Sequence, residues 1–92
     1  MVDLAIGGSV SRDEIFDLCN KVKDAFGAGK PVRLDGSQAD GLTPILAQVI
    51  LAAGKAASEG GQSFTLVSPS AAMIDAFQGF GLFADLMTIP ME

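Results

Sequence analysis

Apolar residues follow a two-residue period in three short stretches of this chain. Residues 2–6 read VDLAI, so apolar side chains share one face of an extended backbone, and the glycine pair at 7–8 is typical of a tight hairpin turn. The stretches PVRLDG at 31–36 and SFTLVS at 63–68 show the same alternation and contain residues that strands favour. These patterns predict three main strands, the first with a hairpin continuation and the second ending in turn residues.

A helical period separates the first two predicted strands. Ser11 and Glu14 have the spacing of a capping box, in which each side chain bonds the backbone of the other residue. Apolar residues then recur every third or fourth position, at Ile15, Cys19, Val22 and Phe26. The pattern predicts an amphipathic helix that ends at Gly27 or Gly29.

Two later helices are predicted by a hydroxyl residue that is followed by proline, in the dipeptides TP at 43–44 and SP at 68–69. Threonine and serine are good N-cap residues, and proline is tolerated at the first helical position. The first of these helices is expected to end at about Ser58, before a glycine pair. The second is expected to break and restart within 79–87, which reads GFGLFADLM.

The resulting order, βαβαβα, predicts the α/β class and one domain over residues 1–92. Strands that alternate with helices favour a parallel sheet with right-handed crossovers. We therefore expect a mixed, mostly parallel sheet of about four strands, parallel after the first, packed with three to four helices. The inward positions predict a core of Leu4, Ile6, Ile15, Cys19, Val22, Val32, Leu34, Leu46, Ile50, Phe64, Leu66, Met73 and Phe77.

Composition narrows the classes of partner. With 49% apolar residues the chain is expected to fold by itself, and with 11 acidic against 6 basic residues it is expected to repel nucleic acid and anionic lipid. The longest nearly uncharged stretch, 41–54, is shorter than the roughly 20 residues that span a bilayer. A single cysteine and a start without a basic segment predict no secretory signal and a cytoplasmic location.

Residues that carry enzyme chemistry are few. Histidine is absent, and the glycine groups lack the spacings that bind phosphate. Cys19 lies on an apolar stripe without a nearby base, so packing is the simpler interpretation of it. The acidic residues Asp13, Glu14, Asp17 and Asp24 are typical of a solvated helix. We therefore expect a protein that is not an enzyme and that needs no cofactor and no metal.

The later half carries a resemblance to a known family. The elements concerned are Gly8-Ser9-Val10, the D-x-S of Asp35 and Ser37, Gly60-Gly61, Ser68-Pro69-Ser70 and Phe80-Gly81-Leu82. In this order and spacing they resemble the STAS domain family of bacterial anti-sigma factor antagonists, with chemotaxis-linked members the most similar. The resemblance covers nearly the whole chain and implies a STAS-type fold.

The family's phosphorylated hydroxyl lies in a D-S-S-G-L stretch that this chain matches only in part. Counted forward from Asp35, Thr43 stands at the family's aspartate and Pro44 at its hydroxyl. Counted back from the glycine pair at 60–61, Thr43 takes the hydroxyl position instead. The tight turn favours the forward count, in which Gln48 falls where chemotaxis-linked relatives carry a similar Gln-Val/Leu pair. Thr43 is thus either an N-cap alone or also a candidate phosphoacceptor.

The resemblance implies a regulatory module of bacterial signalling that docks a kinase-type protein partner, an anti-sigma factor or a signalling kinase. Its alternative is the STAS adaptor subunit of an ABC-type lipid-transport complex. Docking is expected through the loop 36–43 and the exposed face of the next helix, where Gln48 either faces solvent or contacts the partner. The expected partner-binding residues are Asp35, Ser37, Gln38, Asp40, Thr43 and Gln48.

Overall fold

The computed structural model describes residues 2–8, 11–40 and 42–92 and places the predicted strands and helices in the expected order. Ser9 and Val10 of the Gly8-Ser9-Val10 element lie outside the described residues, as does Gly41. The elements are β1 (Val2–Gly8), α1 (Arg12–Gly27), β2 (Val32–Ala39), α2 (Pro44–Gly60), β3 (Phe64–Val67), α3 (Ala71–Gly79) and α4 (Phe83–Leu86).

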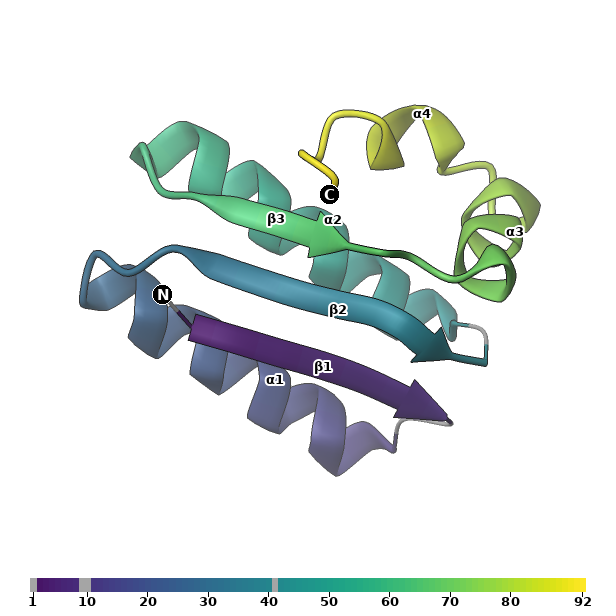
Figure 1. Cartoon of the computed structure of the whole chain (residues 1–92), viewed down its shortest axis with the longest axis horizontal. Coiled ribbons are helices and arrows are strands. Elements are labelled where there is room, and N and C mark those ends of the chain that lie inside the picture. The colour runs from purple at the N-terminus through teal and green to yellow at the C-terminus, as the bar shows by residue number, and fades with distance from the viewer. Residues whose placement is uncertain (1, 9–10, 41) are drawn as a thin grey trace.

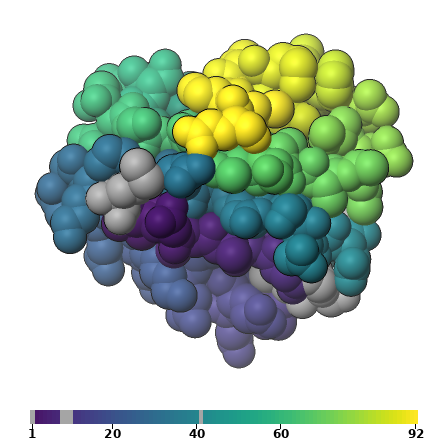
Figure 2. All heavy atoms as spheres, viewed as in Figure 1, coloured from purple at the N-terminus to yellow at the C-terminus, as the bar shows by residue number. Residues whose placement is uncertain are grey.

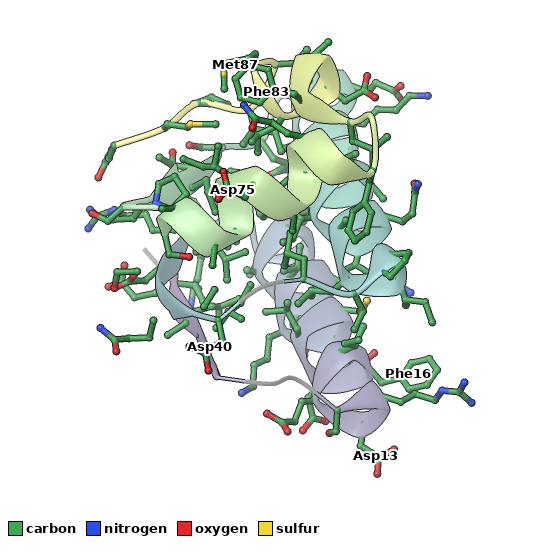
Figure 3. All side chains as sticks on the ribbon, turned by 90° about the vertical axis from the view of Figure 1, so that its right-hand side faces the viewer. Asp13, Phe16, Asp40, Asp75, Phe83 and Met87 are labelled. Carbon is green, nitrogen blue, oxygen red and sulfur yellow. The ribbon has the colours of Figure 1, made fainter. Side chains whose placement is uncertain are left out.

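The strands form one sheet in the order β1-β2-β3, and both pairings are parallel (Figure 1). α1 connects β1 to β2 and α2 connects β2 to β3, and both helices lie behind the sheet in this view. Viewed from the end of the strands, the sheet lies on the left and α1 and α2 lie on the right (Figure 3). The helices α1 and α2 therefore cover the same face of the sheet.

The prediction of an α/β fold is confirmed, but the predicted sheet was wrong in two respects. Over the described residues the sheet has three strands and not four, and β1 is parallel to β2 instead of forming a hairpin. The reason is that α1 occupies residues 12–27 of the segment between them, and a helical crossover returns the chain to the edge of the sheet at which β1 begins. The nearest approach to a fourth strand is a parallel bridge between Leu66 and Met91.

The core lies between the sheet and the helices. Alternate residues of β2 and β3, such as Val32 and Leu66, point toward the helices and are buried. Of the predicted core, Leu4 and Cys19 are only half-buried, because Leu4 lies in an edge strand and Cys19 faces a surface groove. Buried residues that the sequence analysis did not name are Leu18, Ala25, Ala39, Ala47, Ala57, Leu86 and Ile89.

The helix starts follow the predicted capping signals with one exception. Ser11 and Glu14 form the predicted capping box, and Thr43 caps α2 with Pro44 in its first turn. The prediction that Ser68 caps the third helix was wrong, because Ser70 is its N-cap. The Ser70 hydroxyl accepts the Met73 N–H at 3.1 Å and donates to the Ala39 carbonyl at 2.7 Å, a tertiary contact that fixes the start of α3.

We predict that Leu66→Ala lowers the free energy of unfolding by about 2 to 5 kcal/mol, because Leu66 is 0% exposed and its removal leaves a cavity. The neighbouring Thr65→Ala, on the opposite face of β3, is expected to cost less than about 1 kcal/mol. Urea denaturation of both variants measures the difference. Equal losses would contradict the assignment of the inward face of β3.

Candidate functional site

The candidate site lies where the three named strands end. Their carboxyl ends point to the right in Figure 1, and Figure 3 looks directly at that edge. α1 and α2 begin at this edge, and α3 begins close to it. Asp40 follows β2 here, and Thr43 precedes α2, so these two predicted residues belong to the edge.

Thr43 is an exposed residue whose hydroxyl is part of the helix cap. Its Oγ1 accepts a hydrogen bond from the Leu46 N–H at 3.2 Å, and its backbone is extended, as an N-cap requires. Pro44 occupies the first turn, where its missing N–H costs no helical bond. The cap interpretation of Thr43 is thereby confirmed, and its role as a phosphoacceptor stays a prediction.

Asp35 and Ser37 lie within β2, where the sequence predicted a turn. The register with β1 pairs Ala5 with Asp35 and Gly7 with Gln38, so β2 carries one extra residue in a bulge. The Ser37 N–H donates to Asp35 Oδ1 at 2.8 Å. Hydrogen bonds from Ser37, first its hydroxyl and then its N–H, lower the pKa of Asp35, with a smaller effect of the charge on Arg33.

Gly36 is buried in this bulge because α3 packs directly against it. A Cβ at this position would lie 2.6 Å from Met73 Sδ and 3.4 Å from the Pro69 Cα. The Ser70 N–H also donates to the Gly36 carbonyl at 3.1 Å. The contacts with α3 therefore fix the position of the β2 backbone at its carboxyl end, and with it the positions of the side chains at this edge.

The structure does not gather all six predicted residues on one surface. Asp35 lines a hollow on the open face of the sheet with Asp3 and Arg33, and Ser37 and Gln38 are exposed near the end of β2. Gln48 is exposed on α2 and lines a groove between α2 and the α4 region. The sheet and α2 are separate layers, so Asp35 and Gln48 face opposite sides of the molecule.

The solvent side of α2 has an unusual composition. Its outward residues Ile45, Gln48, Ala52 and Ala56, which we call the α2 outer face, are all exposed, and Ile45 keeps 55% of its surface accessible. Lys55 is the first charged residue of the helix. A surface helix normally carries charged or polar residues on this side. The sequence signal for this face was the position of Ile45 beside the inward Leu46.

Grooves border the α2 outer face on both sides. A groove of about 250 Å³ between α1 and α2 is lined by Cys19, Val22, Lys23, Phe26, Val49 and the alanines of α2. A groove of about 520 Å³ lies between α2 and the α4 region, with Gln48, Lys55, Leu82 and Asp85 among its lining residues. Ala52 lines both, so the small side chains of α2 form a low ridge between two depressions.

The part of the chain that the structure describes shows neither a metal site nor a membrane-spanning helix. Within residues 2–8, 11–40 and 42–92, no three Cys, Asp or Glu side chains gather closely enough to hold a metal ion. None of the helices in the same ranges is long and apolar enough to cross a membrane. Comparisons with protein-family models and with curated proteins find no match for this chain.

We predict that Ser37→Ala raises the pKa of Asp35 toward its ordinary value, because the hydroxyl contributes most to the lowered pKa. The Ser37 N–H remains, so part of the lowering is expected to persist. A lowered pKa means that the folded chain binds the proton more weakly than the unfolded chain. The stabilisation is thus present above the unfolded pKa and is lost as the pH falls through the folded pKa.

Carboxyl NMR titration of the parent protein and of Ser37→Ala measures this difference. Ser63→Ala, at an exposed serine before β3, is the matched control and is expected to leave the Asp35 titration unchanged. The same Asp35 pKa in the parent and in Ser37→Ala would show that the hydroxyl does not bond the carboxylate in solution.

Proposed function

We propose that this chain is a non-enzymatic regulatory module that docks a protein partner through the α2 outer face and the adjoining residue Thr43. The observation that carries the proposal is the α2 outer face itself, which has an exposed isoleucine at its start, no charged residue before Lys55, and a groove on each side of Ala52. A helix that is apolar on nearly all sides is typical of a buried helix. Docking a partner would bury the remaining side.

The shape of this surface favours a protein over a small molecule. Both grooves are open depressions joined at Ala52, and a low alanine ridge lets side chains of a partner enter on either side. Ile45 supplies an apolar anchor at one end, and Lys55 and Glu59 supply a polar rim at the other. The chain contains no Trp or Tyr, two of the residues that most often dominate the binding energy of interfaces, so a modest affinity is expected.

The resemblance to the STAS family supports the same assignment. It leads us to propose that the partner is a kinase-type protein of bacterial signalling and that the module acts in partner switching or in a chemotaxis-linked pathway. Thr43, as the N-cap of α2, and Gln48 lie beside or on the proposed docking surface, whereas Asp40 lies on the sheet side of the molecule (Figure 3). Asp35 does not lie on the docking surface either, because its carboxylate faces the open side of the sheet.

We propose further that phosphorylation of Thr43 is the switch for docking. The Thr43 side chain is exposed and stands at the N-terminus of α2, where a phosphate would interact favourably with the helix dipole. The fold is therefore expected to tolerate the modification. The phosphate is expected to weaken docking instead. The partner would have to desolvate, or lie against, about −1.5 to −2 additional charges at the edge of its binding surface.

Ala52→Arg and Gln48→Arg are predicted to weaken docking at least about tenfold, because each places a long charged side chain on the α2 outer face. The matched controls Ala72→Arg and Gln78→Arg make the same changes at exposed positions of α3 and are expected to bind normally. Affinity capture from the source cells with mass spectrometry identifies the partner, and titration calorimetry compares the variants. Equal binding by all four variants and the parent would exclude this surface.

Thr43→Glu is predicted to bind the identified partner about thirty- to a hundredfold more weakly than Thr43→Ala, a loss of about 2 to 3 kcal/mol. Both variants lose the cap, so their melting temperatures should be similar, each lower than that of the parent by the equivalent of about 1 kcal/mol. Incubation with the cognate kinase and mass spectrometry locate any phosphate. Equal binding by the two variants together with an unmodified Thr43 would leave the residue as a cap only.

A further inference from the structure

The two outer edges of the sheet differ in whether another segment of the chain is hydrogen-bonded to them. Residues 90–92 cover the outer edge of β3, where the Leu66 N–H donates to the Pro90 carbonyl at 2.9 Å and the Ser68 N–H donates to the Glu92 carbonyl at 2.9 Å. No residue among those described pairs with the outer edge of β1. An uncovered edge strand presents a row of backbone donors and acceptors to any chain that can pair with it.

One set of backbone groups in β1 points away from β2. The Val2 N–H points to β2, since it donates to the Pro31 carbonyl at 2.8 Å. Backbone groups alternate along a strand, so those of Asp3 and Ala5 point to the free side. The sequence of β1, VDLAIGG, contains neither lysine nor proline, the residues that commonly block pairing at an edge.

A hollow lies beside this edge, on the helix side. Its volume is about 160 Å³, and Leu4 and Ile6 of β1 line it together with Leu18 of α1. Figure 1 shows α1 running past the free side of β1, behind the position that a further strand would occupy. Inward side chains of an added strand would therefore lie over Leu4 and Leu18 and close to the charged side chains of the hollow, and they would complete the burial of Leu4, which is now partial.

The charges around the edge are mostly negative. Glu14 and Asp17 of α1 line the hollow, and Asp3 is exposed on the open face of β1. Lys21 is the basic residue that lines the same hollow. Asp3 already forms an ion pair with Arg33 at 3.8 Å, but Glu14 and Asp17 face one ammonium group in the hollow, so the helix side of the edge favours basic side chains of an occupant.

We propose that the free edge of β1 binds an extended segment of a protein partner in which apolar residues alternate with lysine or arginine. The segment adds as a strand beside β1. Its basic side chains lie on the helix side, where their aliphatic stems cover Leu4 and Leu18 and their charges reach Glu14 and Asp17, and its apolar side chains lie on the open face of the sheet. This interaction surface is separate from the α2 outer face, so it extends the proposed function and does not depend on it.

The probe is a synthetic peptide of 7 residues, the length of β1, in which valine and lysine alternate. Added to the ¹⁵N-labelled protein, it is expected to slow amide hydrogen exchange at Asp3 and Ala5 at least about tenfold, since these N–H groups become hydrogen-bonded. The same peptide with alternate amides N-methylated should not bind. Slower exchange at α2 instead of β1, or equal binding by the N-methylated peptide, would overturn the proposal.

Two variants localise the effect. Ala5→Pro removes an outward N–H and should abolish peptide binding while the circular dichroism of the fold is retained. Asp17→Lys reverses one charge in the hollow and should weaken binding about tenfold or more, whereas Asp24→Lys, on the same helix but outside the hollow, should change it little. Equal losses from the two α1 variants would show attraction by net charge alone. Protection of the same amides by dimer formation without peptide would assign the edge to a second copy and overturn the proposal.

Discussion

β1, β2 and β3 run in the same direction and in the order in which they occur in the chain, so each connection must cross back over the sheet before the next strand begins. Crossovers between parallel strands are almost always right-handed. When successive right-handed crossovers advance in one direction across a sheet, they place their helices on the same face. α1 and α2 accordingly share one layer, and the rest of the molecule is arranged around that layer.

The other face of the sheet is exposed for the same reason. Parallel sheets usually have helices on both faces and apolar residues on both sides of each strand. Here the outward positions carry Asp3, Arg33, Asp35 and Thr65, and Arg33 forms ion pairs with Asp3 and Glu92. Figure 2 shows residues 90–92 lying over the neighbouring strands on this face. The polar alternation is thus the sequence feature that allows a parallel sheet to keep one face in water.

The two proposed binding surfaces occupy places where this arrangement leaves apolar groups incompletely covered. α2 packs its Leu46 and Ile50 side against the sheet, and its opposite side has no further layer over it in the structure described. β1 is the strand from which the crossovers start, so its free edge has no neighbour among the described elements. At the carboxyl edge of the sheet, the packing of Met73 on Gly36 holds α3 beside the end of β2.

Short-range features of the chain were determined by the sequence alone. The capping box at Ser11 and Glu14, the cap at Thr43 with Pro44, and the inward alternation of β2 and β3 depend on neighbouring residues only, and all appear in the structure. The glycine pair does end α2, with Gly61 as its αL C-cap, although the helix runs to Gly60 and not only to the predicted Ser58. Most of the predicted core is also buried, because periodicity identifies the inward side of an element without knowledge of its neighbours.

Only the tertiary structure decided features that depend on contacts between distant segments. The parallel direction of β1, the bulge at Asp35 and Ser37, and the choice of Ser70 over Ser68 as a cap arise from pairing with β2, from the packing of α3 and from the Ala39 carbonyl. The separation of Asp35 from Gln48 also depends on tertiary structure. The two residues are close in the sequence, but Asp35 belongs to the sheet and Gln48 to the helix layer on its other side. A periodic pattern identifies which side of a helix or strand is buried. Which part of the protein surface the opposite side belongs to depends on the elements that pack around it.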